Sequence, residues 1–184
     1  MRIAFMGVSG SGKDFLSDYL TNNKNFTRLS FSDQLKKLSH QIYPWMKLNY
    51  NPEEKATPLN ITLQTGEVIT YSPRDIWLNL DHLRNIEEKI FIRMLEDEIS
   101  SLKKGNPTMD NIVITDIRSN SEFLWCQENQ FTIVYITRKN NNYIKYDIDK
   151  HITENKEKAD YHFANDANGL VEFKSFFEEV LCCG

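Results

Sequence analysis

The sequence predicts an α/β protein in which a five-stranded parallel sheet lies between two layers of helices. Three observations lead to this prediction. Short apolar runs alternate with segments whose apolar residues recur every three to four positions, as in strands joined by crossover helices. A glycine-rich stretch, GVSGSGKD at residues 7–14, directly follows the first apolar run. A later apolar run at residues 111–115 ends at Asp116, and ligands of parallel sheets bind at the carboxyl edge of the strands.

Residues 7–14 fit the G-x-x-x-x-G-K part of a phosphate-binding loop. Gly7, Gly10 and Gly12 let the backbone turn its N–H groups inward, and the following helix adds its positive end, so that main-chain donors can hold a phosphate. Lys13 supplies a mobile positive charge to the outer phosphates. The alternative is a Gly/Ser turn that binds nothing. The strand, loop, lysine and helix occur in the required order, which favours nucleotide binding.

Asp14 departs from this motif, because a Ser or Thr normally offers Mg²⁺ a hydroxyl at this position. Two interpretations stay open. The carboxylate holds the ion directly or through water, or it is an acidic first-turn residue that interacts favourably with the helix dipole.

The bulk properties limit the kind of protein. The chain has 184 residues, which is enough for one domain over 1–184 and too short for two full ones. Its formal net charge is −4 without blocks of like charge, so neither nucleic acid nor a membrane is expected as a partner. The cysteines, Cys126, Cys182 and Cys183, lack metal-ligand spacing, and the chain begins with a strand pattern rather than a signal peptide. We expect a cytoplasmic protein with reduced thiols.

The amino-terminal elements follow the apolar pattern. A buried strand is expected at residues 2–6, a helix at 14–20 and a short second strand at 28–31. Ser32 or Asp33 can cap the helix that comes next.

Residues 33–105 resemble a largely helical insertion between the second and third strands of the sheet. Within it, the alternation over 61–71 favours a small hairpin. The run SPRD at 72–75 has the pattern of a helix start, with Ser as the cap and Pro at the first helical position. This pattern places Arg74 beside exposed N–H groups, where an anion is favoured. A longer helix is expected to open at Arg84.

The carboxyl-terminal half continues the alternation of strands and helices. A helix is expected at 122–128, strands at 131–137 and 160–164, a turn at 165–169 and a final amphipathic helix at 170–181.

Three groups of polar residues allow both a structural and a functional interpretation. Lys36 and Lys37 are either two solvated lysines or phosphate ligands. Asp116 and Arg118 are either an ion pair that holds a loop or a ligand site, and the phosphate-binding loop in the same sheet favours the site. The basic stretch at 138–151 is either a lid-like flap over the transferring phosphoryl group or a polar loop.

The order of these motifs resembles that of the bacteriophage deoxynucleoside monophosphate kinases. Those enzymes share a GKD loop, a Pro-Arg helix start, an acid-x-Arg after the third strand and a late Asn-containing segment. The GKDF and TDIR features are also similar to animal phosphomevalonate kinases, whereas SPR at 72–74 and the preceding GEVIT favour the phage enzymes. The resemblance implies a three-layer P-loop kinase fold with strand order 2-3-1-4-5, a helical acceptor-binding insertion and a short lid.

The resemblance also implies an activity. The γ-phosphoryl group of ATP would pass to a deoxynucleoside monophosphate with Mg²⁺ as cofactor, in the cytoplasm of an infected host cell if the chain is phage-encoded. A homodimer is an open alternative to a monomer. Two other functions remain as alternatives: phosphorylation of another small phosphorylated acceptor such as phosphomevalonate, and a nucleotide-binding module without catalysis.

The resemblance assigns roles to individual residues. The implied ATP ligands are Gly7, Ser9, Gly10, Ser11, Gly12, Lys13, Asp14, Asn165, Asp166 and Ala167. The implied acceptor ligands are Ser32, Lys36, Arg74, Arg84 and Arg118. The implied catalytic residues are Lys13, Asp116, Arg118 and Arg138, and the implied metal ligands are Asp14 and Asp116.

Overall fold

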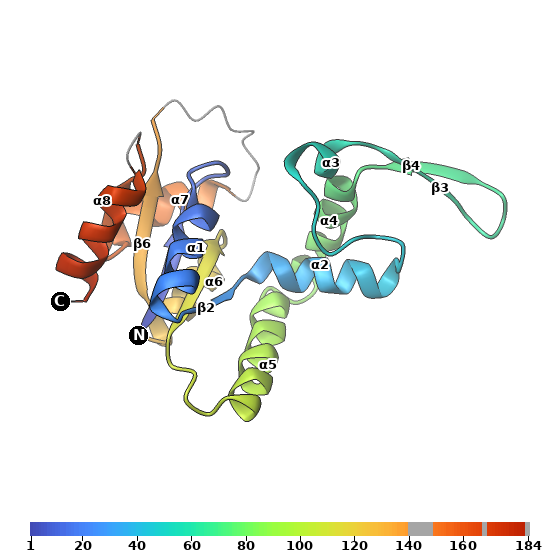
Figure 1. Cartoon of the computed structure of the whole chain (residues 1–184). Coiled ribbons are helices and arrows are strands. Elements are labelled where there is room, and N and C mark those ends of the chain that lie inside the picture. The colour runs from blue at the N-terminus through green and yellow to red at the C-terminus, as the bar shows by residue number, and fades with distance from the viewer. Residues whose placement is uncertain (140–148, 167–168, 183–184) are drawn as a thin grey trace. The chain divides into compact units, whose positions relative to one another are not determined.

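The computed structural model describes residues 1–139, 149–166 and 169–182, and the chain divides into two compact units (Figure 1). The first unit comprises Met1–Ser30 and Glu96–Gly184, and the second comprises Phe31–Leu95. The predicted insertion at 33–105 therefore differs from the second unit in its bounds, because helix α5 (Ile90–Gly105) crosses the boundary between the units.

The first unit contains a parallel sheet and its crossover helices. Its strands are β1 (Arg2–Met6), β2 (Thr27–Leu29), β5 (Ile112–Ile117), β6 (Thr132–Thr137) and β7 (Tyr161–Ala164). Its helices are α1 (Lys13–Lys24), α6 (Asn120–Glu128), α7 (Asp149–Asn155), the 3₁₀ turn Lys156–Lys158, α8 (Gly169–Phe176) and the π-helical turn Phe177–Leu181 that continues it.

The sheet has the order β2-β5-β1-β6-β7, and every pairing in it is parallel. This numbering differs from the predicted 2-3-1-4-5 because a hairpin in the second unit takes the numbers β3 and β4. Counted among the parallel strands alone, the order is the predicted one. Strand β1 is central, and the loop that follows it therefore lies at the point where the strand order reverses, which is the usual ligand site of such sheets.

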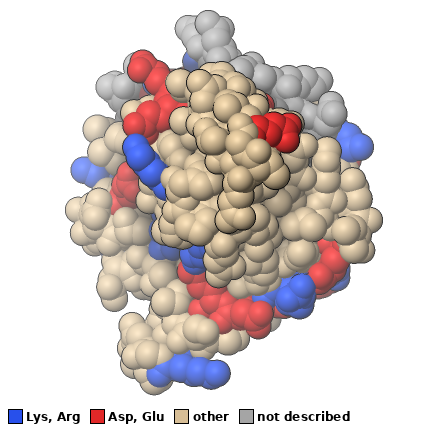
Figure 2. Space-filling view, turned by 90° about the vertical axis from the view of Figure 1, so that its right-hand side faces the viewer, with Lys and Arg blue, Asp and Glu red and all other residues tan. Residues whose placement is uncertain are grey.

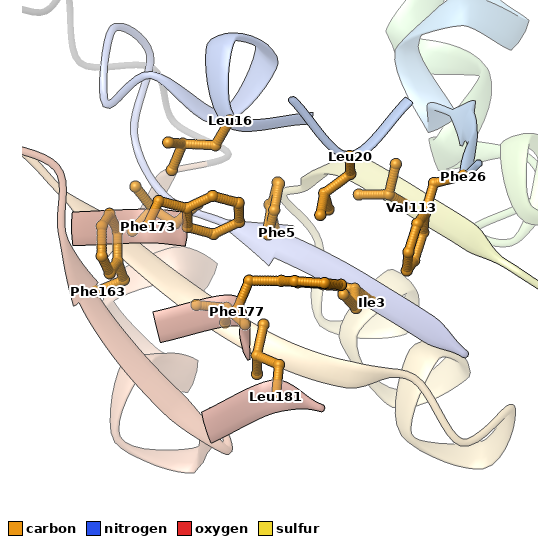
Figure 3. Close-up of a cluster of buried hydrophobic side chains, with 12 residues drawn as sticks. Ile3, Phe5, Leu16, Leu20, Phe26, Val113, Phe163, Phe173, Phe177 and Leu181 are labelled. Atoms are coloured by element: carbon orange, nitrogen blue, oxygen red, sulfur yellow. The ribbon is translucent and has the colours of Figure 1, made fainter. Parts of the chain in front are cut away.

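One face of the sheet is covered by α1 and α8 through a shared apolar core. Phe5 of β1 packs edge to face against Phe173 of α8, with ring centroids 5.9 Å apart, and Leu16 of α1 is fully buried in the same cluster (Figure 3). Helices α6 and α7 contact each other on the opposite face (Figure 1). This core fixes α1 against the sheet, and α1 begins with the residues that directly follow the phosphate-binding loop.

A bulge interrupts the pairing of β1 with β5. Ala4 pairs with Ile114, but Met6 pairs with Ile117, so β5 contains one more residue than β1 across this interval. An extra residue of this kind locally re-aims the side chains of the bulged strand. The bulge lies at Asp116, the acidic residue that the sequence places at the end of the strand.

The second unit consists of short helices and a hairpin. Its elements are α2 (Phe31–Ile42), α3 (Pro52–Ala56), β3 (Leu59–Thr62), β4 (Val68–Tyr71), α4 (Pro73–Asp81), the 3₁₀ turn His82–Asn85 and the amino-terminal part of α5. The predicted hairpin is confirmed, because β3 and β4 pair in antiparallel register with Ile61 opposite Ile69. Trp77 of α4 donates a 3.0 Å hydrogen bond from Nε1 to the Ser39 hydroxyl of α2 and ties these helices together.

Three predicted boundaries were wrong. Helix α2 begins at Phe31, so Ser32 and Asp33 lie in its first turn and do not cap it. The second strand ends at Leu29 instead of residue 31, because Phe31 is drawn into the helix and is buried there. Arg84 does not open the longer helix, since it lies in the 3₁₀ turn and α5 begins at Ile90.

The surface carries charges of both signs. On the face shown in Figure 2, Lys and Arg side chains are interspersed with Asp and Glu between uncharged residues. Within residues 1–139, 149–166 and 169–182, no helix has the length and apolar character needed to cross a membrane.

Candidate active site

The phosphate-binding loop connects β1 to α1 and depends on two of its glycines. Gly7 lies so close to β6 that a Cβ atom there would be 2.3 Å from the carbonyl oxygen of Ile136. Gly12 caps α1 with φ +91°, a left-handed conformation that residues with side chains rarely adopt. Gly12 offers no side-chain cap to the helix. The first-turn N–H groups of α1 are therefore the kind of donors that an anion can satisfy.

Lys13 folds back over this loop. Its Nζ donates hydrogen bonds to the carbonyl oxygens of Gly7 (2.7 Å) and Val8 (2.8 Å) and to the Ser11 hydroxyl (3.3 Å). The side chain is only 8% exposed. The ammonium group therefore links three oxygen acceptors of the loop.

The pKa of Lys13 is shifted by its burial and by four charged side chains nearby. The pKa of Lys13 is lowered from 10.5 to about 8, first by burial and then by the nearby Arg118 guanidinium, whereas Asp14, Asp116 and Asp149 oppose this shift. One further cation and three carboxylates thus lie within electrostatic range of Lys13. A perturbed lysine inside such a cluster is typical of a functional site.

Asp116 occupies the bulge at the end of β5 and is only 6% exposed. Its Oδ2 accepts a 2.7 Å hydrogen bond from the hydroxyl of Ser30, the residue that follows β2. The backbone N–H of Arg118 donates to Oε2 of Glu122 (2.8 Å), and Glu122 also completes a capping box with Ser119 at the start of α6. Glu122 therefore fixes the backbone from which the Arg118 side chain extends.

Asp14 lies in the first turn of α1 with its side chain 79% exposed. Its Oδ1 is 3.2 Å from Nη2 of Arg28 on β2. Ion pairs this exposed contribute little stability, so the carboxylate can exchange Arg28 for another cation at small cost. Both interpretations of Asp14 proposed from the sequence are compatible with this position.

A cavity of about 520 Å³ adjoins the loop. It is lined by Gly12, Phe15, Arg138, Asn165, Asp166, Gly169, Leu170 and Val171. The Phe15 and Val171 side chains are 54% and 67% exposed and provide an apolar wall. A volume of this size is in the range of nucleotide and cofactor sites.

The polar residues of the cavity are partly engaged with the protein. Asp166 accepts a 3.0 Å hydrogen bond from the backbone N–H of Lys139 and pairs with its Nζ at 3.2 Å, and these hydrogen bonds lower the pKa of Asp166. The Nδ2 of Asn165 donates to the carbonyl oxygen of Ser11. Ala167 and residues 140–148 of the expected lid lie outside the described residues.

The residues predicted to bind the acceptor lie mostly in the second unit. Lys36 forms a 2.5 Å ion pair with Asp33 within α2. Arg84 pairs through Nε with Asp81 (2.8 Å), and its guanidinium group stacks 4.7 Å from the centre of the Phe91 ring. Both cations are therefore held by neighbours close to them in the sequence.

The predicted cap of α4 is confirmed. The Ser72 hydroxyl accepts from the backbone N–H of Asp75. The Asp75 carboxylate accepts from the Ser72 hydroxyl and from the Ser72 backbone N–H, and these two hydrogen bonds lower the pKa of the Asp75 carboxyl. Arg74 lies in this first turn, but part of the helix terminus is already satisfied by its own capping box.

The donor set fits a magnesium ion that a nucleotide shares with the protein. No cluster of three or more His, Cys, Asp or Glu suited to a metal occurs among the described residues. Nucleotide enzymes, however, usually hold Mg²⁺ through one or two carboxylates together with substrate phosphates and water. Asp14 and Asp116 both act on the pKa of Lys13 and can provide these carboxylates.

Several residues at the site were missed from the sequence. Ser30 and Arg28 join it through hydrogen bonds to residues distant in the sequence, and Asp149 lies within electrostatic range of Lys13; no local pattern indicates any of the three. Glu122 could have been found, because Ser119 and Glu122 have the spacing of a capping box.

Comparison with known proteins gives a family and a fold. Residues 75–174, more than half of the chain, match the family model described as deoxynucleotide monophosphate kinase. No curated protein matches the chain. Among solved structures, shikimate kinase from Aquifex aeolicus is similar, with 15% identity, TM-score 0.52 and coverage of 97% of this chain and 95% of that one. TT1252 from Thermus thermophilus has 14% identity, TM-score 0.56 and coverage of 98% and 95%. Dephospho-CoA kinase from Campylobacter jejuni has 15% identity, TM-score 0.52 and coverage of 98% and 95%.

Proposed function

Because the chain belongs to the deoxynucleotide monophosphate kinase family, we propose that it transfers the γ-phosphoryl group of ATP to a deoxynucleoside monophosphate, giving ADP and a deoxynucleoside diphosphate. One observation carries the proposal. Lys13 of a phosphate-binding loop lies within electrostatic range of Asp116 and Arg118 at the carboxyl edge of the sheet. This cluster combines a polyphosphate cradle with the charges that phosphoryl transfer requires.

The reaction needs little covalent chemistry from the protein. An oxygen of the acceptor phosphate attacks the γ-phosphorus while the bond to the departing ADP oxygen breaks. A phosphate monoester is largely dianionic at pH 7, so the attacking oxygen has no proton to lose and no general base is required. The protein contributes by placing the two phosphates in line and by neutralising their charge.

Lys13, Arg118 and Arg138 are the proposed sources of positive charge. The ammonium of Lys13 is bound to three neutral oxygens of the loop. An anionic phosphate oxygen is a stronger partner than these neutral oxygens, and its negative charge would raise the pKa of Lys13. Arg138 borders the cavity beside Asn165 and is the proposed cation from the lid side.

The proposed metal ligands are Asp14 and Asp116. Bound together with the nucleotide, Mg²⁺ supplies neutralisation of the charge on the β- and γ-phosphate oxygens. Asp116 is oriented for this role by Ser30, and Asp14 is accessible from solvent.

The cavity beside Gly12 is the proposed position of the donor base, which would pack on the exposed ring of Phe15. Lys36 and Arg74 of the second unit, with Ser32 and Arg84, are the proposed ligands of the acceptor. Lys36 would have to exchange Asp33 for the acceptor phosphate.

A coupled assay of ADP release tests the proposal. The purified chain is given ATP, Mg²⁺ and each of the four common deoxynucleoside monophosphates, and in parallel phosphomevalonate and dephospho-CoA. We expect turnover with at least one deoxynucleoside monophosphate and a loss of about 10³-fold in kcat for Lys13→Ala. The matched control is Lys24→Ala, because Lys24 lies at the other end of α1 and pairs with Glu178.

Two outcomes contradict the proposal. ADP release with only phosphomevalonate or dephospho-CoA would make the chain a kinase of another small molecule. ATP binding without ADP release for any acceptor would make it a nucleotide-binding module.

A further inference from the structure

Asn165 joins three segments that are far apart in the sequence. Its backbone N–H donates to the carbonyl oxygen of Thr137 at the end of β6 (2.8 Å). Its side-chain Nδ2 donates to the carbonyl oxygen of Ser11 in the phosphate-binding loop (2.8 Å), across 154 positions of the chain. The residue is only 5% exposed, so neither hydrogen bond is readily replaced by water.

The Asn165 side chain is also wedged between two glycines. A Cβ atom on Gly12 would lie 2.0 Å from Asn165 Nδ2, and a Cβ atom on Gly169 would lie 1.8 Å from Asn165 Oδ1. A side chain at either glycine would displace the Asn165 amide from this position. The glycines on both sides therefore leave the space that Asn165 fills, between the phosphate-binding loop and the start of α8.

We propose that Asn165 is a positioning residue that holds the Ser11 carbonyl group and Gly12, and thereby keeps the loop in its phosphate-binding conformation before a nucleotide arrives. The proposal rests on the nucleotide binding proposed above. A loop containing Gly7, Gly10 and Gly12 has much conformational freedom to lose. Ordering it in advance removes that cost from the binding step.

This role differs from the direct ATP contact that the family resemblance implies for Asn165. The amide nitrogen of the side chain is already committed to Ser11, and the amide oxygen packs against Gly169. Asn165 acts on the nucleotide through the backbone of the loop.

The variants Asn165→Ala and Asn165→Asp test the proposal through their affinity for ADP, measured by calorimetry between pH 5.5 and pH 8. The ratio of each variant's Kd to that of the wild type cancels the titration of ADP itself. We expect a rise of about tenfold for Asn165→Ala that does not depend on pH.

Asn165→Asp gives the more specific test, because its Kd ratio to wild type is expected to depend on pH. When ionised, its carboxylate opposes the Ser11 carbonyl oxygen, and burial raises its pKa. When protonated, it regains a donor for that oxygen. The Kd ratio should therefore exceed that of Asn165→Ala at pH 8 and fall several-fold towards pH 5.5. If the Kd ratio of Asn165→Asp to wild type does not change with pH, the proposal is wrong. If Asn165→Ala does not fold, this pH dependence tests the proposal without it.

Hydrogen exchange of the nucleotide-free protein separates positioning from direct contact. Asn165→Ala should speed exchange of the amides of residues 10–14, whereas a residue that touched only the nucleotide would leave them unchanged and the proposal would be wrong. Asn23→Ala is the matched control, because Asn23 also donates from Nδ2 to a backbone carbonyl, that of Tyr19 (3.0 Å), at the exposed end of α1.

The two proposals fail in different ways. Wild-type protein that binds ADP but phosphorylates no deoxynucleoside monophosphate refutes the proposed acceptor and leaves the role of Asn165 standing, provided that the variants behave as expected. Wild-type protein that binds no ADP overturns both.

Discussion

The hydroxyl group of Ser30 donates a 2.7 Å hydrogen bond to Oδ2 of Asp116, and both residues are almost completely buried. The bond joins the carboxyl ends of β2 and β5, two neighbouring strands of the sheet. Asp116 lies in the bulge of β5, where side chains do not follow the regular alternation of a strand. The hydrogen bond from Ser30 therefore orients the Asp116 carboxylate.

Ser30→Ala should reduce kcat about tenfold, because Asp116 loses the donor that orients it, and should lower the free energy of unfolding by about 1–2 kcal/mol. Steady-state kinetics and urea unfolding measure both effects. Ser101→Ala, an exposed serine on α5, is the control and should change neither quantity. Full kcat in Ser30→Ala would show that Asp116 needs no such orientation.

Lys13 should make the stability of the protein rise with pH. Its pKa is about 8 in the folded protein and 10.5 in the unfolded chain, so the unfolded state binds more protons between these values. Relative to Lys13→Met, the wild type should gain up to about 3 kcal/mol in the free energy of unfolding from pH 7.5 to pH 10.5. Denaturant titrations at both pH values measure the gain.

Lys24 provides the control for this pH dependence. The hydrogen bond that Lys24 donates to the Glu178 carboxylate raises the pKa of Lys24, so any stability linked to it is lost only as pH rises through that higher value. The difference in the free energy of unfolding between wild type and Lys24→Met should show no gain between pH 7.5 and pH 10.5. An equal gain in both comparisons would mean that Lys13 is not the group responsible.

Asp14→Ala should raise the Mg²⁺ concentration that gives half-maximal activity by about fivefold, since one of two proposed carboxylate ligands is removed. Asp18→Ala is the control, because Asp18 is exposed on the same helix one turn later. An unchanged Mg²⁺ titration would leave Asp14 as a first-turn acid that interacts only with the helix dipole and Arg28.

Phe15→Ala should raise the KM for ATP about fivefold without changing the KM for the acceptor, because the donor base loses an aromatic packing surface worth about 1 kcal/mol. Leu124→Ala removes a comparably exposed apolar side chain from α6 and should leave both constants unchanged. A rise in the KM for the acceptor alone would contradict the proposed position of the base.

The structural predictions that were confirmed rest on short sequence patterns. The capping box at Ser72, the hairpin over 61–71 and the strand that ends near Asp116 follow from patterns within a few residues, and the structure contains all three. Arg84 was misassigned because a 3₁₀ turn and a helix start differ little in sequence. The start of α2 was misplaced because burial of Phe31 overrides the capping preference of Ser32.

The sequence by itself determined the phosphate-binding loop and the alternation of strands and helices, because glycine geometry, capping and apolar periodicity act over short stretches of chain. The order of the parallel strands was predicted from the family resemblance. Only the tertiary structure decided which side chains support the loop. Ser30 meets Asp116 across 86 positions and Asn165 meets Ser11 across 154, and both contacts exist because the sheet brings distant strand ends to one edge. Such contacts depend on packing, and no local pattern in the sequence encodes them.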